Sequence, residues 1–326
     1  MPDFDGGHYF LTALLPVKLG AVEQPAGVFT SHVHTLRDVL AYVPPALQSR
    51  ANEHRGVNSP FAHSRRTHFA RLVVIADVAF NGRVGKDSIG DALRSTDLLL
   101  PQPVDQLPSP YLLFVADFDA ADGSDAEVEA YLHELWTAME PDWRLILAHC
   151  HGFPDNPGAY EFVRGLRRCQ VETTMPFNDY WRTLPDLKAL TIPLPAVVGP
   201  VAAAGLVLLA GIVGILVATI RHTEKHLWAW LILAGLLGVI GGVAHALWKI
   251  REHAQKPLPG APGNDLPSVL KSLYLQQHFV RFAIDNQGAS PAALHAAFGA
   301  FIGTHRPDDP VAPTQPAGVV RSIVPA

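Results

Sequence analysis

The chain has few cysteines for its length. Among 326 residues only Cys150 and Cys169 occur, and their spacing matches no common metal motif. Two cysteines do not suggest the disulfide framework of a small secreted domain, so the composition fits a reducing compartment. The start of the sequence also lacks the marks of a secretory signal, because acidic residues precede its apolar part and no small-residue cleavage site follows. Both absences predict that the N-terminal part stays in the cytoplasm.

Basic residues are not in excess, and the familiar nucleotide motifs are missing. The chain holds 25 Lys and Arg against 30 Asp and Glu, a net charge of −5, and no basic tail or stripe. This predicts no nucleic-acid partner. No GxxxxGK, GxGxxG or GxSxG sequence occurs, so neither a phosphate-binding loop nor a nucleophile elbow is expected.

Charge is absent from two long apolar runs. Val197–Ile220 and Leu227–Trp248 contain no Asp, Glu, Lys or Arg, and they are joined by the short polar link RHTEKH. About 20 apolar residues in a helix cross the ~30 Å hydrocarbon core of a bilayer. The sequence therefore predicts an antiparallel transmembrane hairpin over residues 197–248. Basic residues on both flanks favour a protein of the cell inner membrane with two spans and both termini in the cytoplasm.

Small residues recur every four positions in both runs. Residues four apart share a helix face, and small side chains there let two helix backbones approach closely. The stripe could pack the hairpin on itself or against another copy of the chain, and we favour the first. Its members are Ala210, Gly214 and Ala218 in the first run and Ala234, Gly238, Gly242 and Ala246 in the second.

The residues before the hairpin alternate between strand and helix patterns. The predicted strands are His8–Val17, Thr67–Val78, Tyr111–Phe118 and Trp143–His149, and the predicted helices are Thr30–Val43 and Ser124–Met139. This order predicts an α+β domain over residues 1–156, a ferredoxin-like βαββαβ unit with an antiparallel sheet. Its helices would cover one face of the sheet. The other face needs cover, from a second copy, from residues 157–190 or from the membrane-proximal helices, and we expect a homodimer or a partner in a membrane complex.

The remaining segments are predicted to be mainly helical. Residues 157–196 form a membrane-proximal helical connector, whose three arginines either face solvent or contact anionic lipid head groups. After the hairpin, residues 264–304 form a C-terminal pair of amphipathic helices, Leu266–Ile284 and Ala292–Ile302. The Pro-rich residues 305–326 are predicted to be disordered. The three arginines are Arg164, Arg167 and Arg168.

Polar residues of interest lie on or beside the predicted strands. His68 and Arg71 are three positions apart on one strand and should point to opposite faces, whereas Asp117 and Asp119 should share a face. Asp119 can also be interpreted as part of the turn before the following helix. His149 and His151 flank Cys150 at the end of the last predicted strand. Two histidines are too few for a zinc site, which needs three or four ligands, so no metal site is predicted.

The sequence resembles a bacterial group with ferredoxin-like domains at the words THFARLVVI, YLLFVADFD, YLHELW and HCHGFP. More widely, Asp3–Pro154 is similar to the dimeric α/β-barrel superfamily, which includes dye-decolourising peroxidases, chlorite-dismutase-like haem proteins and small monooxygenases. The resemblance implies the fold. It also implies that haem is possible, with His68, His149 or His151 as an axial ligand and Arg71 as a cation that polarises peroxide.

Two functions follow as hypotheses. The first is a membrane-anchored protein facing the cytoplasm, whose ferredoxin-like domain binds or scaffolds a partner. The alternative is a membrane-bound, haem-dependent oxidoreductase of peroxidase type that acts on an apolar substrate. Under the alternative, the catalytic candidates would be His68, Arg71, Asp117 and Asp119, and the cofactor-binding candidates would be His149 and His151. The sequence does not decide whether the protein is an enzyme.

Overall fold

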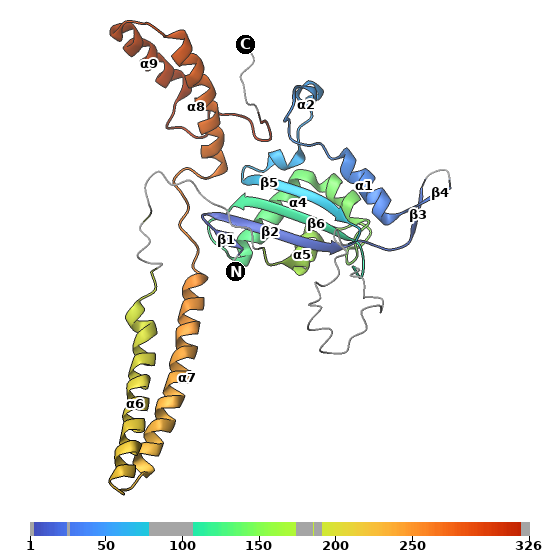
Figure 1. Ribbon diagram of the computed structural model, residues 1–326. Helices are drawn as coiled ribbons and strands as arrows, with labels where there is room; N and C mark the ends of the chain where they lie inside the picture. Colours follow the sequence, from blue (N-terminus) through green and yellow to red (C-terminus); the bar gives the residue numbers. More distant parts are fainter. Residues whose placement is uncertain (1–2, 25–26, 78–106, 174–184, 186–190, 321–326) are drawn as a thin grey trace, which may run out of the picture. The chain divides into compact units, whose positions relative to one another are not determined.

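The computed structural model describes residues 3–24, 27–77, 107–173, 185 and 191–320. The chain forms two compact units. The larger one combines Asp3–Asp179 with Gly260–Ala326, and the other contains the two long apolar helices within Tyr180–Pro259 (Figure 1). The hairpin is thus inserted between two stretches of sequence that fold together.

The larger unit is built on an antiparallel sheet. Its long strands are β2 (His8–Pro16), β5 (Thr67–Ile75) and β6 (Tyr111–Asp119), and β6 lies between the other two. The short strands β1 (Phe4–Asp5) and β7 (Gln170–Val171) both pair with β2. A separate ribbon consists of β3 (Ala21–Gln24) and β4 (Val28–Ser31). The mixed α+β class and the antiparallel sheet are therefore as the sequence predicted.

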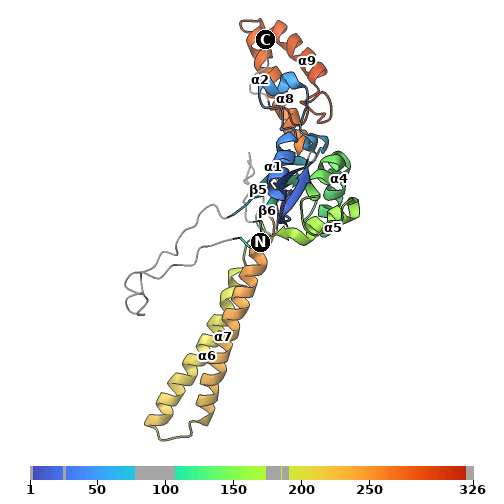
Figure 2. The same ribbon diagram turned by 90° about the vertical axis from the view of Figure 1, so that its right-hand side faces the viewer.

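Alternation along the strands gives the sheet one buried face. Every second residue of β2 and β6 belongs to the main core, namely Tyr9, Leu11, Ala13, Leu15, Leu112, Phe114, Ala116 and Phe118. Helix α4 (Asp125–Leu147) supplies much of the opposing layer, and its Tyr131 ring stacks 3.6 Å from the Phe118 ring. Helices α1 (His32–Tyr42) and α5 (Ala159–Cys169) add Leu36 and Phe162 to the same core. Figure 2 shows α4 and α5 on one side of β5 and β6.

Local signals explain where several helices begin. The hydroxyl of Ser124 accepts a hydrogen bond from the Glu127 backbone N–H at 3.3 Å, so Ser124 is the N-cap of α4. Ser31 caps α1 in the same way. Two short helices, α2 (Arg50–Arg55) and the 3₁₀ helix η1 (Pro60–His63), connect α1 to β5.

The predicted strand Trp143–His149 is wrong. Residues 143–147 continue α4 past a kink at Met139, where φ is −146° and ψ is 37°, and Ala148 and His149 form a turn after the helix. Pro141 lies just beyond the kink. Trp143, Ile146 and Leu147 are fully buried, whereas Leu145 is 58% exposed. Burial at i, i+3 and i+4 is the spacing of a helix. The sequence WRLIL of residues 143–147 is too short to show this spacing, and the charged Arg144 interrupts its apolar pattern. The outer edge of β2 pairs with the two-residue strand β7 instead.

The second unit is a pair of long helices, α6 (Leu194–Ile220) and α7 (His226–Ala254), of 27 and 29 residues. Both are long and apolar enough to span a membrane. A core helix of a soluble protein would be mostly buried, but only 17% and 11% of their most apolar windows are buried. Several glycines make the close contacts between them: a Cβ at Gly235 would lie 2.6 Å from the Leu208 backbone, and one at Gly238 would lie 2.9 Å from the Ala204 Cβ. Part of the predicted stripe therefore packs the hairpin on itself, through Gly214, Gly238 and Gly242, whereas Ala210 and Ala234 are exposed.

The C-terminal segment belongs to the larger unit. Helices α8 (Leu266–Asp285) and α9 (Pro291–His305) correspond to the two helices predicted there. They pack against each other through phenylalanines such as Phe282 and Phe301. Residues 305–320, predicted to be disordered, make specific contacts: the Leu47 N–H donates to the Gly318 carbonyl at 2.8 Å, and the Lys271 ammonium donates to the carbonyl of Pro313. Residues 321–326 and 174–184 lie outside the described residues, as does Val78 of the predicted second strand.

Candidate functional site

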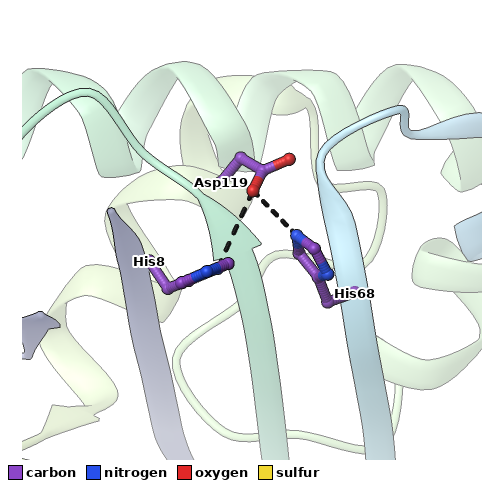
Figure 3. Close-up of side chains that lie close together, drawn as sticks. All are labelled: His8, His68 and Asp119. Atoms are coloured by element: carbon purple, nitrogen blue, oxygen red, sulfur yellow. Dashed lines mark hydrogen bonds and ion pairs between the residues drawn. The ribbon is translucent and has the colours of Figure 1, made fainter. Parts of the chain in front are cut away.

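Three side chains that are far apart in the sequence meet at one end of the sheet. His8 is the first residue of β2 and lies directly opposite Asp119, the last residue of β6. His68, near the start of β5, approaches from the other side of β6 (Figure 3). A ligand-capable atom from each of the three lies within 4.8 Å of the other two. We call these residues the His–His–Asp cluster.

A β-bulge brings His68 into this cluster. Thr67 pairs with Phe118 and Phe69 pairs with Asp117, so His68 is an extra residue on β5. Its Nε2 lies 2.7 Å from Oδ1 of Asp119. Asp119 is on the face of the sheet away from the core, because its neighbour Phe118 is in the core. Arg71 lies over the ring of Phe69 on that face as well, so the prediction that His68 and Arg71 point to opposite faces is wrong: it assumed unbroken alternation.

Hydrogen bonds fix the proton of His8. The amide nitrogen of Asn264 donates to the Gly6 carbonyl at 2.6 Å and lies 3.1 Å from Nε2 of His8. An amide nitrogen can only donate, so Nε2 of His8 accepts and the ring proton lies on Nδ1. This Nδ1 faces two carboxylates, at 3.8 Å from Oδ1 of Asp117 and 3.7 Å from Oδ1 of Asp119. The ring of His8 is therefore oriented with Nδ1 towards the two acids.

The second oxygen of Asp119 ties the start of α8 to the sheet. Oδ2 accepts a hydrogen bond from the Leu266 backbone N–H at 2.8 Å, one of the donors that the first turn of a helix leaves unsatisfied. The interpretation of Asp119 as part of the turn before α4 thus misses where its carboxylate points. Gly260 passes so close that an added Cβ would lie 2.7 Å from the Gly6 carbonyl oxygen, so only glycine fits there. This segment covers His8, which is fully buried.

The structure brings together only some of the predicted site residues. His68, Asp117 and Asp119 lie in or beside the cluster, whereas Arg71 is an exposed neighbour. His149 and His151 lie at the opposite end of β2, where the Lys18 N–H donates to the His149 carbonyl and the His151 N–H donates to that of Pro16. At about 3.3 Å per residue, the nine residues of β2 separate the two ends by roughly 26 Å. The predicted set therefore does not form one site.

Two residues of the site were not predicted. His8 sits on the same face as Asp119 and directly across from it, but this requires the strand register, which the sequence alone does not fix. Asn264 is 256 positions away from His8 and lies beyond the hairpin. One sequence signal could have indicated His8. It is a polar residue at the start of a predicted strand, and the alternation of the apolar residues that follow places it on the face of the sheet away from the core.

A second histidine pair lies at the far end of β2. Nδ1 of His32 is 3.0 Å from Nδ1 of His149, so one ring donates and the other accepts. Burial lowers the pKa of His149, and the nearby His32 and Lys18 lower it further. Burial and Lys18 likewise lower the pKa of His32. Both rings are therefore neutral near pH 7.

This pair predicts that the protein loses stability in mild acid. A histidine whose pKa is lowered in the folded state makes its full contribution to the free energy of unfolding above the unfolded pKa of about 6.5. This contribution is lost as the pH falls below that value, because the unfolded chain then binds more protons than the folded one. We expect the urea midpoint of the detergent-solubilised protein to fall more between about pH 7.5 and about pH 5.5 in the wild type than in His149→Gln. His133→Gln, at an exposed position, serves as the control. Parallel pH dependence in all three proteins would contradict the assignment.

No protein-family model, curated protein or solved structure matches the chain. The resemblance to the dimeric α/β-barrel superfamily thus stays a prediction. What the site can do follows from its own donors: two imidazoles and a carboxylate, held by three adjacent strands, can relay a proton or ligate a metal ion.

Proposed function

We propose that the protein is a membrane-anchored binding module whose α+β unit faces the cytoplasm. The observation that carries this proposal is the surface of the α6–α7 hairpin. Large apolar side chains point outwards along both helices, and Leu206, Leu216, Leu237 and Trp248 are each more than half exposed. Water would disfavour a surface of this kind, whereas hydrocarbon would not.

The path of the chain supports an even number of spans. The chain leaves the larger unit before α6 and returns to it after α7, so both ends of the hairpin connect to the same folded body. Lys249, Arg251 and Lys256 follow the second apolar run, and basic residues next to a span favour the cytoplasmic side. The link between the helices, with Arg221 and Lys225, would lie on the opposite side.

Membrane extraction and fused reporters test this topology. We expect the full chain to stay in the membrane pellet through an alkaline carbonate wash. A variant with a short Gly/Ser linker in place of residues 197–248 should appear in the supernatant. Reporters that are active only in the cytoplasm should work at both termini. Release of the wild-type protein by carbonate, or periplasmic reporters, would contradict the proposal.

We further infer that the α+β unit has the ferredoxin-like topology. The strand order β7-β2-β6-β5 supports this, with α1 between the first two long strands and α4 and α5 between β6 and β7. In this assignment the two-residue strand β7 takes the place of the fourth strand. Slow hydrogen exchange at the β7 backbone is expected, and exchange as fast as in an exposed loop would contradict the assignment.

A second copy of the chain is the partner that we propose for the sheet. On the face away from the helices, Phe69 is 44% exposed and Val73 is 39% exposed. Anchoring holds copies on one side of the membrane and raises their effective concentration, which favours pairing of like faces. We expect Phe69→Glu to convert a dimer in mild detergent into a monomer. Tyr42→Glu, at a side chain that is 88% exposed on α1, should leave the dimer intact. A monomeric wild type would contradict this proposal.

A further inference from the structure

The distances within the His–His–Asp cluster are close to those of a metal centre. Two ligand atoms that bind a tetrahedral zinc ion at about 2.0–2.1 Å lie about 3.3 Å apart. Nδ1 of His8 is 3.7 Å from Oδ1 of Asp119, and Nε2 of His68 is 2.7 Å from the same oxygen. One pair is slightly wide and the other slightly close, and all three ligand atoms lie within 4.8 Å of one another, so side-chain shifts of roughly an ångström would centre an ion among them. Strands hold all three ligands, which keeps these shifts small.

The donor atoms select a class of ion. Imidazole nitrogens suit divalent zinc, iron, cobalt and nickel, whereas magnesium and calcium prefer sites made of oxygens alone. Two histidines and one carboxylate leave at least one position open for water or for another ligand. Asp117 lies beside the site, with its Oδ1 3.8 Å from Nδ1 of His8, but it is not one of the three converging ligands.

The outer contacts of the cluster resemble those that orient metal ligands. The two carboxylate oxygens of Asp119 have different partners. Oδ1 faces both histidines, and Oδ2 accepts a hydrogen bond from the Leu266 backbone N–H. Hydrogen bonds of this kind fix a ligating carboxylate in place. Binding at Nδ1 of His8 moves the ring proton to Nε2, so the Asn264 amide must turn to present its oxygen there. That turn gives up the bond to the Gly6 carbonyl, a loss small beside the free energy of zinc binding.

We infer that His8, His68 and Asp119 bind a divalent transition-metal ion of the zinc class, with at least one coordination position open to water. The ion joins three strands of the sheet and, through Asp119, the start of α8. The inference goes beyond the proposed function and is independent of it, because the site lies wholly within the larger unit.

Metal binding by the full-length protein in detergent tests the site. After treatment with a chelator, the protein is titrated with Zn²⁺, and the bound metal is measured by elemental analysis. We expect one ion per chain and a visible absorption typical of tetrahedral Co²⁺ when Co²⁺ replaces Zn²⁺. His68→Gln and Asp119→Asn should each weaken binding at least about 100-fold, while His149→Gln should bind as the wild type does.

Thermal unfolding separates loss of the site from loss of the fold. His68 and Asp119 are less deeply buried than His8, so their conservative variants are the ones to test. Zn²⁺ should raise the melting temperature of the wild type and of His149→Gln, but not that of His68→Gln. Two results would overturn the inference: a wild-type protein that takes up no stoichiometric ion, or a folded His68→Gln protein that binds Zn²⁺ with wild-type affinity.

Discussion

Trp143→Ala is expected to lower the free energy of unfolding by about 3–5 kcal/mol, as for other large aromatic side chains removed from a core. The Trp143 ring is fully buried and lies edge-on to Phe114 at 5.3 Å, with Phe162 at 4.8 Å. No single side chain nearby can fill the space that this ring leaves. The substitution therefore removes contacts between α4, α5 and the sheet together.

Leu145→Ala provides the matched control, because Leu145 lies on the same helix with 58% of its side chain exposed. Its substitution should change stability by no more than about 0.5 kcal/mol. Urea unfolding of the two variants in mild detergent, beside the wild type, measures both effects. In a strand, Trp143 and Leu145 would share one face, so similar losses from both substitutions would contradict the helical assignment of residues 143–147.

Gly235→Leu is expected to disrupt the packing of the hairpin. A Cβ at Gly235 would lie 2.6 Å from both the N and the Cα of Leu208, and a backbone cannot move aside as a flexible side chain can. Helices α6 and α7 must therefore separate, with a cost of about 1–3 kcal/mol or more. The variant should lose its monodisperse elution profile in mild detergent at a lower temperature than the wild type.

Gly241→Leu tests the same change on the outer face of α7. No described atom beyond its own helix lies within 4 Å of a Cβ at Gly241, and the position is exposed. Leucine also favours helix over glycine by roughly 0.5–1 kcal/mol, so the control should be neutral or slightly stabilising. Equal destabilisation by both substitutions would mean that the close contact of Gly235 with Leu208 does not hold α7 against α6.

Composition and periodicity were enough to predict the elements whose apolar pattern is regular along their length. The two apolar runs, the strands around His8–Pro16 and Tyr111–Asp119, and the start of α4 at Ser124 all have strong local signals. The region around Trp143 was not predictable in this way, because Pro141 suggests a helix end and the apolar run after it is short. There the packing against Phe114 and Phe162 overrides the local pattern.

Only part of the site could be predicted from the sequence, again because local patterns do not show how distant segments pair. His68 and Asp119 stand out as polar residues at strand ends, but the bulge at His68 and the register of His8 are properties of paired strands rather than of one segment. Asn264 completes the arrangement from beyond the hairpin, and no local rule connects it to His8. His149 was grouped with His68 because Trp143–His149 was predicted to be a strand of the same sheet, whereas residues 143–147 belong to α4.

The inserted hairpin also imposes an order on biosynthesis. Residues 3–173 leave the ribosome with all of the sheet strands, yet the segment that covers His8 and bonds Asp119 begins only at Gly260. Both long helices must emerge before that cover exists. A nascent chain arrested before Gly260 therefore has a sheet with an open end, and the larger unit reaches its final form only after both long helices have been synthesised.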